Sequence, residues 1–340
     1  MVVTLSIYPM GLPLVLLTTL ATISSAQGSH WQRLPRIGLG PRQEHAVASL
    51  GTSIYILGGI AADSGSNIRV VNTVEVFDTS SQTWAVSAPF PHPINHANAA
   101  GVGDNLYVFG GLNDGKSQWD AQPHSYVYSP WNDTWTPIAP VPAGTARGAS
   151  AVGVHGDLVY LAGGMTYLQQ TAEGAQDAVA TVSSYDTVSD TWRSDDLPPL
   201  PEPRQHVCGA VVNGTFYVLG GRTDGRGKVQ GSVFALDLED MGAGWRSLTP
   251  MPTPRGGLGC AAVEGKIHCV GGEKPGHGAH GVYEEVEVYD VASDSWESLE
   301  PMAVPRHGTN AVAVDGKIYV PGGGTKTGAA PVGVMDAYVP

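Results

Sequence analysis

The sequence is poor in charge, in cysteine and in clusters of basic residues, and each shortage excludes a class of function. Only 14% of its 340 residues are charged, the formal net charge is −13, and no segment is rich in Lys or Arg. This argues against nucleic acid or an anionic membrane surface as a partner. The three cysteines have no zinc-site spacing, and neither a phosphate-binding loop nor a Ser/His/Asp catalytic motif is evident.

Only one hydrophobic stretch is long enough to suggest membrane targeting. Gly11 to Ile23 is apolar, and Ser24, Ser25 and Ala26 follow as the small residues that a signal peptidase reads. No Lys or Arg precedes it, since the first charged side chain is Arg33, which departs from the usual signal pattern. An uncleaved anchor is the alternative, but threonine, glycine and proline make a poor spanning helix. We predict a signal peptide at residues 1–26 and a secreted, extracellular protein that does not associate with a membrane after cleavage.

Glycine, in contrast, is abundant, with 45 residues, and much of it recurs in one pattern. Six apolar runs end in a double glycine, and their second glycines are 52, 53, 57, 51 and 51 residues apart: Gly59, Gly111, Gly164, Gly221, Gly272 and Gly323. Five copies are followed, about twenty-five residues later, by a tryptophan: Trp84, Trp135, Trp192, Trp245 and Trp296. The turn pair Asn213-Gly214 between two apolar runs is typical of a β-hairpin. A period near 50 with strand patterning predicts a propeller rather than a helical solenoid.

The fold class predicted is all-β: a single six-bladed propeller with four antiparallel strands in each blade. The last repeat ends the chain with no tryptophan after it, and Trp31 at the start has no repeat of its own. We therefore expect the N-terminal Trp31 strand to close the last blade, which would leave no open edge between first and last blades. The alternative is that Trp31 belongs to a tail.

The repeat resembles that of the kelch (galactose-oxidase-type) β-propeller family, whose unit carries Gly-Gly, then Tyr-Asp, then Trp, then a Pro-Arg entry into the next unit. The resemblance implies one propeller over residues 27–340, with repeats at roughly 41–92, 93–144, 145–201, 202–252, 253–303 and 304–340 plus 27–40. For function it implies little, because kelch propellers serve as enzymes, receptors and scaffolds.

Strand alternation divides the loops between two faces of the propeller. Loops between the second and third strands of each repeat are the long ones, and loops of variable length on one face mark the expected binding face. Two glycosylation sequons, at Asn132 and Asn213, fall on turns of the opposite face. Glycans there would leave the long-loop face open.

Three cysteines in a secreted protein suggest one disulfide and one remaining thiol. With a two-residue turn at Glu264-Gly265, Cys260 and Cys269 oppose each other across a hairpin as a non-hydrogen-bonded pair, so we predict that they are bridged. A Cys208–Cys260 bridge between adjacent blades is the rival, and buried free thiols are a third alternative.

An arginine stands seventeen residues before the second glycine in five of the six repeats: Arg42, Arg147, Arg204, Arg255 and Arg306. In a closed ring these arginines would surround the axis on the long-loop face, where they could bind carboxylates bidentately. The alternative is structural, since kelch repeats resemble one another at this arginine because it ties blades together.

The residues directly after the double glycines should emerge near the channel mouth, and two of them are charged: Arg222 and Glu273. Nearby entries into the blades carry His45, His96, His206 and His307. A carboxylate beside His or Arg could perform acid–base chemistry, so Glu273 is the candidate catalytic residue. Secreted kelch proteins include sialic acid mutarotases, which are similar in fold. Copper radical oxidases resemble the chain in fold only, and no closed set of copper ligands emerges.

We therefore expect a secreted, monomeric kelch protein that binds a protein or carbohydrate ligand on its long-loop face. The candidate binding residues are the five arginines with Arg222, Glu273, His206 and His307. The alternative is an enzyme of the epimerase, mutarotase or cyclase kind, acting on a small acidic or sugar-like substrate at the channel mouth. An intracellular adaptor is disfavoured by the signal segment. No cofactor and no metal are predicted.

Overall fold

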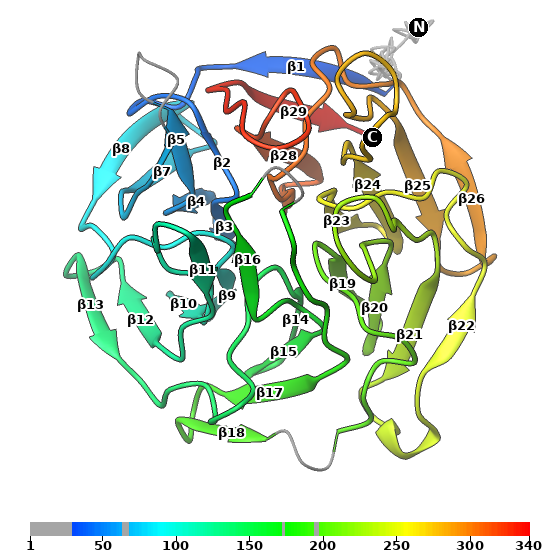
Figure 1. Ribbon diagram of the computed structural model, residues 1–340, viewed down its shortest axis with the longest axis horizontal. Helices are drawn as coiled ribbons and strands as arrows, with labels where there is room; N and C mark the ends of the chain where they lie inside the picture. Colours follow the sequence, from blue (N-terminus) through cyan, green and yellow to red (C-terminus); the bar gives the residue numbers. More distant parts are fainter. Residues whose placement is uncertain (1–28, 63–67, 172–173, 194–196) are drawn as a thin grey trace, which may run out of the picture.

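The structure is a computed structural model that describes residues 29–62, 68–171, 174–193 and 197–340. The predicted signal peptide, residues 1–26, lies outside them. Within the described residues, six four-stranded antiparallel sheets surround a central axis (Figure 1). The helical structure described there is one short 3-10 turn, η1 (Met241–Ala243), and no described helix is long and apolar enough to cross a membrane. The chain is thus the all-β propeller that the repeats predict.

Five blades are each formed by one stretch of chain, and their strands follow one another outward from the axis (Figure 1). The first blade contains β3 (Ala46–Leu50), β4 (Ser53–Leu57), β7 (Val74–Asp78) and β8 (Thr83–Ser87); the second β9 (Asn98–Val102), β10 (Asn105–Phe109), β12 (Ser125–Ser129) and β13 (Thr134–Pro137); the third β14 (Ala151–His155), β15 (Leu158–Ala162), β17 (Val182–Asp186) and β18 (Thr191–Arg193). The fourth contains β19 (Cys208–Val212), β20 (Thr215–Leu219), β21 (Val233–Asp237) and β22 (Arg246–Leu248), and the fifth β23 (Gly259–Val263), β24 (Lys266–Val270), β25 (Val286–Asp290) and β26 (Ser295–Ser298).

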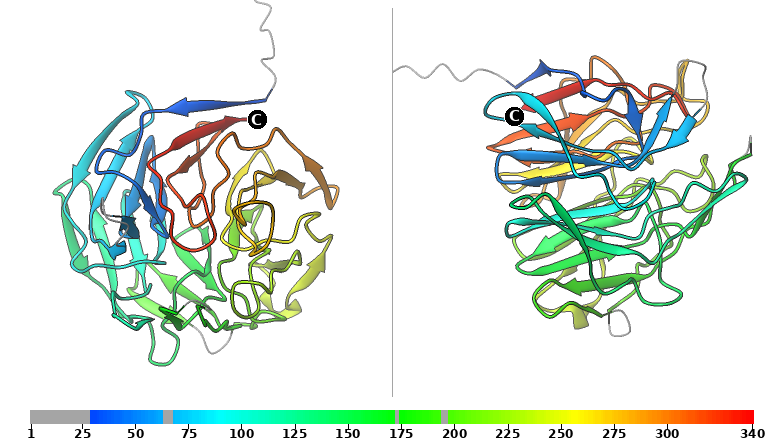
Figure 2. Two further views of the ribbon diagram at one scale, coloured as in Figure 1. Left: turned by 45° about the horizontal axis from the view of Figure 1, so that its top comes forward. Right: turned by 90° about the vertical axis from the view of Figure 1, so that its left-hand side faces the viewer.

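The sixth blade joins the two ends of the described chain. It contains β27 (Val312–Val314), β28 (Lys317–Pro321) and β29 (Met335–Val339), and its outer strand is β1 (His30–Leu34). Both views in Figure 2 show β1 beside β29, with Trp31 opposite Tyr338 in the pairing register. The prediction that the Trp31 strand closes the last blade is confirmed.

The double glycines mark the place where the second strand leaves its blade. In the fourth blade Gly220 and Gly221 have φ values of 65° and 89°, which side chains other than glycine rarely adopt. A Cβ atom on Gly221 would also lie 2.9 Å from the carbonyl oxygen of Gln205, because the chain entering the blade passes directly beside it. The repeat therefore needs glycine both for its conformation and for this close approach.

The core is divided among the gaps between neighbouring blades. Six clusters of buried apolar residues fill these six gaps, including the gap between the sixth and first blades. At the rim of each gap, a repeat tryptophan donates its indole N–H to a backbone carbonyl of the preceding blade at 2.9–3.0 Å: Trp31 to Glu300, Trp84 to Pro35, Trp135 to Ala88, Trp192 to Ala139, Trp245 to Pro198 and Trp296 to Thr249. The tryptophans are therefore joints between blades.

Three aspartates complete these joints. Asp133, Asp190 and Asp294 stand two residues before their tryptophans, and each accepts the backbone N–H of the residue whose carbonyl the tryptophan binds. Each also accepts a tyrosine hydroxyl of its own blade. Where the bound residue is Pro35 or Pro198, no N–H exists, and no aspartate stands at the matching position.

Short strands above the blades form a second layer around the channel mouth. One small sheet combines β2 (Arg42–Gln43), β5 (Ile60–Ala62) and β6 (Ile68–Val70). The other pairs β11 (Gln118–Asp120) with β16 (Tyr167–Gln169), which comes from the next blade (Figure 1). Trp119 packs there against Leu168, so this tryptophan outside the repeat pattern is part of the wall of the mouth.

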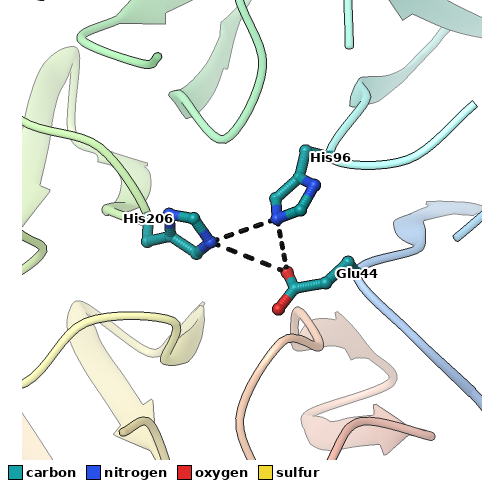
Figure 3. A group of neighbouring side chains, drawn as sticks. All are labelled: Glu44, His96 and His206. Atoms are coloured by element: carbon teal, nitrogen blue, oxygen red, sulfur yellow. Dashed lines mark hydrogen bonds and ion pairs between the residues drawn. The ribbon is translucent and has the colours of Figure 1, made fainter. Parts of the chain in front are cut away.

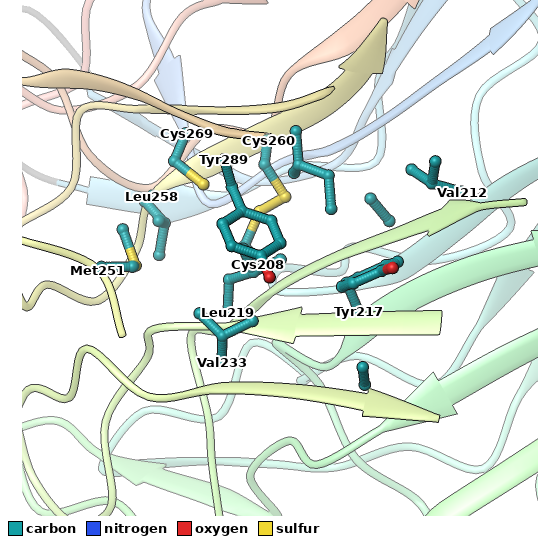
Figure 4. Packing of buried hydrophobic residues seen from close by; sticks show 13 residues of the cluster. Cys208, Val212, Tyr217, Leu219, Val233, Met251, Leu258, Cys260, Cys269 and Tyr289 are labelled. Carbon is teal, nitrogen blue, oxygen red and sulfur yellow. A yellow bond between two sulfur atoms is a disulfide. The ribbon is translucent and has the colours of Figure 1, made fainter. Parts of the chain in front are cut away.

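The predicted Cys260–Cys269 disulfide is wrong. Cys260 and Cys269 do oppose each other across the hairpin of β23 and β24, but the bridge joins Cys260 to Cys208 in the neighbouring blade, with a Cα–Cα distance of 5.9 Å (Figure 4). Directly opposed side chains on one sheet face project side by side, whereas Cys208 and Cys260 point toward each other across the gap between blades. Cys269 is a free thiol, and burial raises its pKa to about 12.

Candidate functional site

The five repeat arginines lie inside the blades rather than around the axis, and none is more than 2% exposed. Arg255 is typical: its Nε donates to the carbonyl of Gly271 at 2.7 Å, and its Nη2 to that of Cys269 at 3.2 Å. A buried guanidinium with partners in its own blade has no surface left for a ligand. The expected ligand-binding role of Arg42, Arg147, Arg204, Arg255 and Arg306 is therefore corrected to a structural one.

Each arginine faces the second residue of its own blade's third strand, and the two positions vary together. The arginine contacts are Arg42 with Glu75, Arg147 with Ser183, Arg204 with the ring of Phe234, Arg255 with Glu287, and Arg306 with Asp336. In the second blade the arginine is replaced by Ile94, the partner position carries Tyr126, and both belong to one apolar cluster. In the second blade an apolar pair thus replaces both residues, whereas Arg147 and Arg204 are buried without a third-strand carboxylate, and Arg204 pairs instead with Glu202 at 2.7 Å.

The channel mouth is encircled by six residues that share one place in the repeat, fifteen residues before the second glycine. All six have φ between 48° and 65°: Glu44, His96, Ala149, His206, Gly257 and Gly308. Backbone hydrogen bonds join successive members, for example from the N–H of His96 to the carbonyl of Glu44 at 2.9 Å. This conformation suits glycine and disfavours other residues, so Glu44, His96 and His206 are held in it at a conformational cost.

Three side chains of this ring converge across the axis, from the first, second and fourth blades (Figure 3). His96 Nε2 lies 3.2 Å from Glu44 Oε2 and 3.1 Å from His206 Nε2, and His206 Nε2 lies 3.9 Å from Glu44 Oε2. The Glu44 side chain is 9% exposed, and both histidines are buried. The three groups form a nearly closed layer across the channel.

A second polar group borders this layer. His307 Nδ1 lies 3.3 Å from Glu273 Oε1 and 3.7 Å from Glu44 Oε1, while Arg222 donates to Glu273. Glu273 Oε2 has no hydrogen-bond partner among the described residues. The structure thus brings Arg222, Glu273, His206 and His307 together, as the sequence pattern suggested.

Burial and neighbouring charges change the protonation of the central groups. Burial by itself raises the pKa of the Glu44 carboxyl, but attraction to His96, His206 and His307 outweighs it and holds the pKa well below its usual range. Burial, and then the charge of Arg222, lowers the pKa of His206 well below that of a free histidine. At neutral pH Glu44 is therefore a carboxylate and His206 a neutral imidazole.

The layer separates two cavities on the axis. One, of about 90 Å³, extends toward the inner strands and is lined by residues such as Asn98 and Thr309. The other, of about 70 Å³, opens toward the long loops. Its wall combines apolar side chains with charged ones: Ile60, Ile68, Trp119, Leu168, Arg222, Arg226, Glu273 and His307.

Sequence reasoning missed Glu44 as a member of this site and did not single out His96 above His45. The signal was available in the repeat spacing, because Glu44, His96 and His206 occupy the same offset. His45 is one residue further on and points into the blade, where Nε2 meets the carbonyl of Pro321 at 3.0 Å. Burial lowers its pKa to about 3, so it remains neutral.

The two sequon asparagines lie on exposed turns. Asn132 is in the turn between β12 and β13, and Asn213 is in the turn between β19 and β20 with a φ of 49°. Their glycosylation remains a prediction.

Comparison with known proteins agrees with this architecture. The family model described as the KLHDC2/KLHL20/DRC7 Kelch-repeats domain matches residues 20–194 and 172–324. The chain belongs to the kelch-repeat family. It is similar to the kelch-like protein terF of Aspergillus terreus, with 36% identity over 91% of this chain and 68% of that protein. It is also similar to human kelch-like protein 23, with 26% identity over 78% of this chain and 43% of that protein.

Kelch-like protein 41a of Danio rerio is a further relative, with 29% identity over 68% of this chain and 36% of that protein. The chain thus spans less than half the length of the two vertebrate relatives. Kelch-repeat proteins generally take part in protein interactions.

Proposed function

We propose that this kelch propeller is a secreted binding protein whose long-loop face receives a protein ligand with a carboxylate next to an apolar side chain. The observation that carries the proposal is the position of Arg226 in the wall of the outer cavity. Among the described residues Arg226 has no ion pair or hydrogen bond, although its guanidinium lies beside Gly174 and Gly328 of two other blades. An unpaired guanidinium in a partly enclosed mouth favours an anionic group.

The opposite part of the wall supports the apolar half of the ligand. Ile60, Trp119 and Leu168 form one buried cluster at the mouth, and Ile68 beside them is 40% exposed. An aromatic and aliphatic surface next to a single cation is typical of an anchor pocket at a protein interface. Secretion is supported by the apolar segment before Ala26 and by the Cys208–Cys260 bridge, since disulfides persist in oxidising compartments.

The test is a selection of displayed random peptides on the intact secreted chain, followed by binding measurements on variants. We expect the selected peptides to carry Asp or Glu beside a large apolar residue, and to lose at least tenfold in affinity on Arg226→Gln. Lys228→Gln is the matched control, because it removes one positive charge from an exposed position of the same loop. Peptides without an acidic residue, or equal losses in the two variants, would contradict the proposal.

A glycan ligand and an enzymatic role remain alternatives to this protein-binding function. The enzymatic one is favoured by a specific observation, the unpartnered Glu273 Oε2 beside His307 in the wall of the cavity. Such a carboxylate could accept a proton from a small acidic or sugar-like substrate, as an epimerase, mutarotase or cyclase requires. Glu273→Gln would then keep ligand binding and abolish turnover. Equal turnover in that variant would exclude the catalytic role.

A further inference from the structure

The geometry points to a binding site for one divalent transition-metal ion on the propeller axis, held by Glu44 Oε2, His96 Nε2 and His206 Nε2. The ion belongs to the class that prefers imidazole nitrogen together with one carboxylate, such as zinc, cobalt(II) or iron(II). The inference does not rest on the protein ligand proposed above, and the three residues also line the outer cavity.

The spacing of the three ligand atoms matches the size of such an ion. They form a triangle with sides of 3.1, 3.2 and 3.9 Å. The circle through three points with these separations has a radius of about 2.0 Å, and Zn–N and Zn–O bonds are about 2.0–2.2 Å long. One point therefore lies at bonding distance from all three atoms, with no movement of the backbone.

The hydrogen bonds behind the histidines orient them as metal ligands. Asn95 Nδ2 donates to the carbonyl of Asn113 at 2.9 Å, which turns its Oδ1 toward His96 Nδ1. In the neutral ring His96 Nδ1 then carries the hydrogen, and Nε2 presents a lone pair to the axis. Gln205 Oε1 faces His206 Nδ1, although Gln205 Nε2 has no hydrogen-bond partner among the described residues. Metal-binding histidines usually donate their other ring N–H to a carboxylate, a backbone carbonyl or a water, which fixes the tautomer, and a side-chain amide oxygen is an acceptor of the same kind.

In the neutral tautomers, the two imidazole lone pairs and the Glu44 carboxylate face one region of the axis. A cation placed there would be attracted by all three groups. The nearest guanidinium, Arg222, is already paired with Glu273. A divalent ion would satisfy all three acceptors and keep an open coordination position for a water or another ligand.

The backbone conformation of the ring supports a functional role for the side chains of Glu44, His96 and His206. Glycine occupies the same left-handed position in two blades, as Gly257 and Gly308, and is the residue that the conformation favours. The three ligand residues occupy the position despite a cost of roughly 1–2 kcal/mol each. Strain of this kind clusters at functional sites, and Ala149 holds the same conformation in the third blade without a polar side chain.

The glycines at the same position in other blades suggest a substitution that should remove a ligand and preserve the fold. His206→Gly removes one ligand and introduces the residue that the fifth and sixth blades already have there. Ala149→Gly is the matched control, since it releases the same backbone conformation in the third blade without removing a ligand. Both variants and the parent chain are prepared without a histidine tag, stripped with a chelator, and titrated with Zn²⁺ and with Co²⁺ by calorimetry and visible absorption.

We expect the parent chain and Ala149→Gly to bind one Zn²⁺ or Co²⁺ per chain, with ligand-field absorption for Co²⁺, and no Mg²⁺ at the same concentrations. His206→Gly should bind at least about 100-fold more weakly and lose the Co²⁺ spectrum, while its urea midpoint without metal is equal to or above that of the parent. The inference is overturned if parent and His206→Gly take up metal equally, or if the parent binds none because the three acceptors share a proton instead.

Discussion

The pairing of Arg255 with Glu287 can be tested by giving the fifth blade the residues of the second. Arg255→Ile alone removes the cation that faces a buried carboxylate and leaves Glu287, a 3% exposed side chain, with the hydroxyl of Thr253 at 2.7 Å. The double variant Arg255→Ile/Glu287→Tyr reproduces the apolar combination of Ile94 and Tyr126. If Arg255 is a structural partner of Glu287, the substitution Glu287→Tyr should restore part of the stability that Arg255→Ile removes.

The expected loss in the free energy of unfolding follows from the burial of both Arg255 and Glu287. Removing one member of a fully buried ion pair typically costs about 3–5 kcal/mol, because the remaining charge is left without compensation. Glu287→Tyr should cost less, about 1–2 kcal/mol, since Arg255 keeps its bonds to backbone carbonyls and the aromatic ring of Phe234 already occupies this position beside Arg204 in the fourth blade. The double variant should recover at least about 2 kcal/mol relative to Arg255→Ile.

The assay is urea unfolding followed by tryptophan fluorescence, in a complete double-substitution cycle. For a chain of this size, 3–5 kcal/mol corresponds to a midpoint shift of roughly 1 M urea. Two results would refute the reasoning: additive effects of Arg255→Ile and Glu287→Tyr, or an Arg255→Ile variant as stable as the parent. Either would mean that the arginine is not a partner of the third strand and is available for another role.

The remaining predictions concern the disulfide and the joints between blades. Cys208→Ser opens a bridge that spans 52 residues and should lower the free energy of unfolding by about 4 kcal/mol in the chain-entropy estimate, whereas the control Cys269→Ser leaves the bridge intact. Thiol labelling after denaturation without reductant should modify Cys269 in the parent chain. Labelling of Cys208 in the parent chain would contradict the pairing. Hydrogen bonds from the Tyr289 hydroxyl and then from the N–H of Thr249 lower the pKa of Asp294 in the folded protein. The contribution of Asp294 to the free energy of unfolding is therefore fully present above about pH 4, near its unfolded pKa, and is lost as the pH falls through the lower folded pKa. Asp294→Asn should therefore destabilise the protein at pH 7 and make little difference near pH 2, and a stability difference that does not depend on pH would count against this account.

The repeat pattern was sufficient to predict the strands, the number of blades and the closure by Trp31, because each of these depends on local periodicity. A double glycine, a turn pair and a tryptophan at constant spacing specify one blade, and six copies specify a ring. The position of Glu273 and Arg222 directly after double glycines also located the channel mouth. The strands and the mouth position can be read within one repeat, and the number of blades and the closure by Trp31 follow from counting the copies.

The arginine role depended instead on packing within a blade, and the disulfide and the centre of the site depended on contacts between repeats. Whether Arg255 points to the axis or into its blade is decided by Glu287, thirty-two residues later, and by the carbonyls of the second strand. Whether Cys260 joins Cys269 or Cys208 is decided by the direction of side chains across a gap between blades. The sequence alone determined what each blade is. Only the closed ring decided that Glu44, His96 and His206, from three different blades, meet on one axis, because their proximity results from the curvature of the whole propeller.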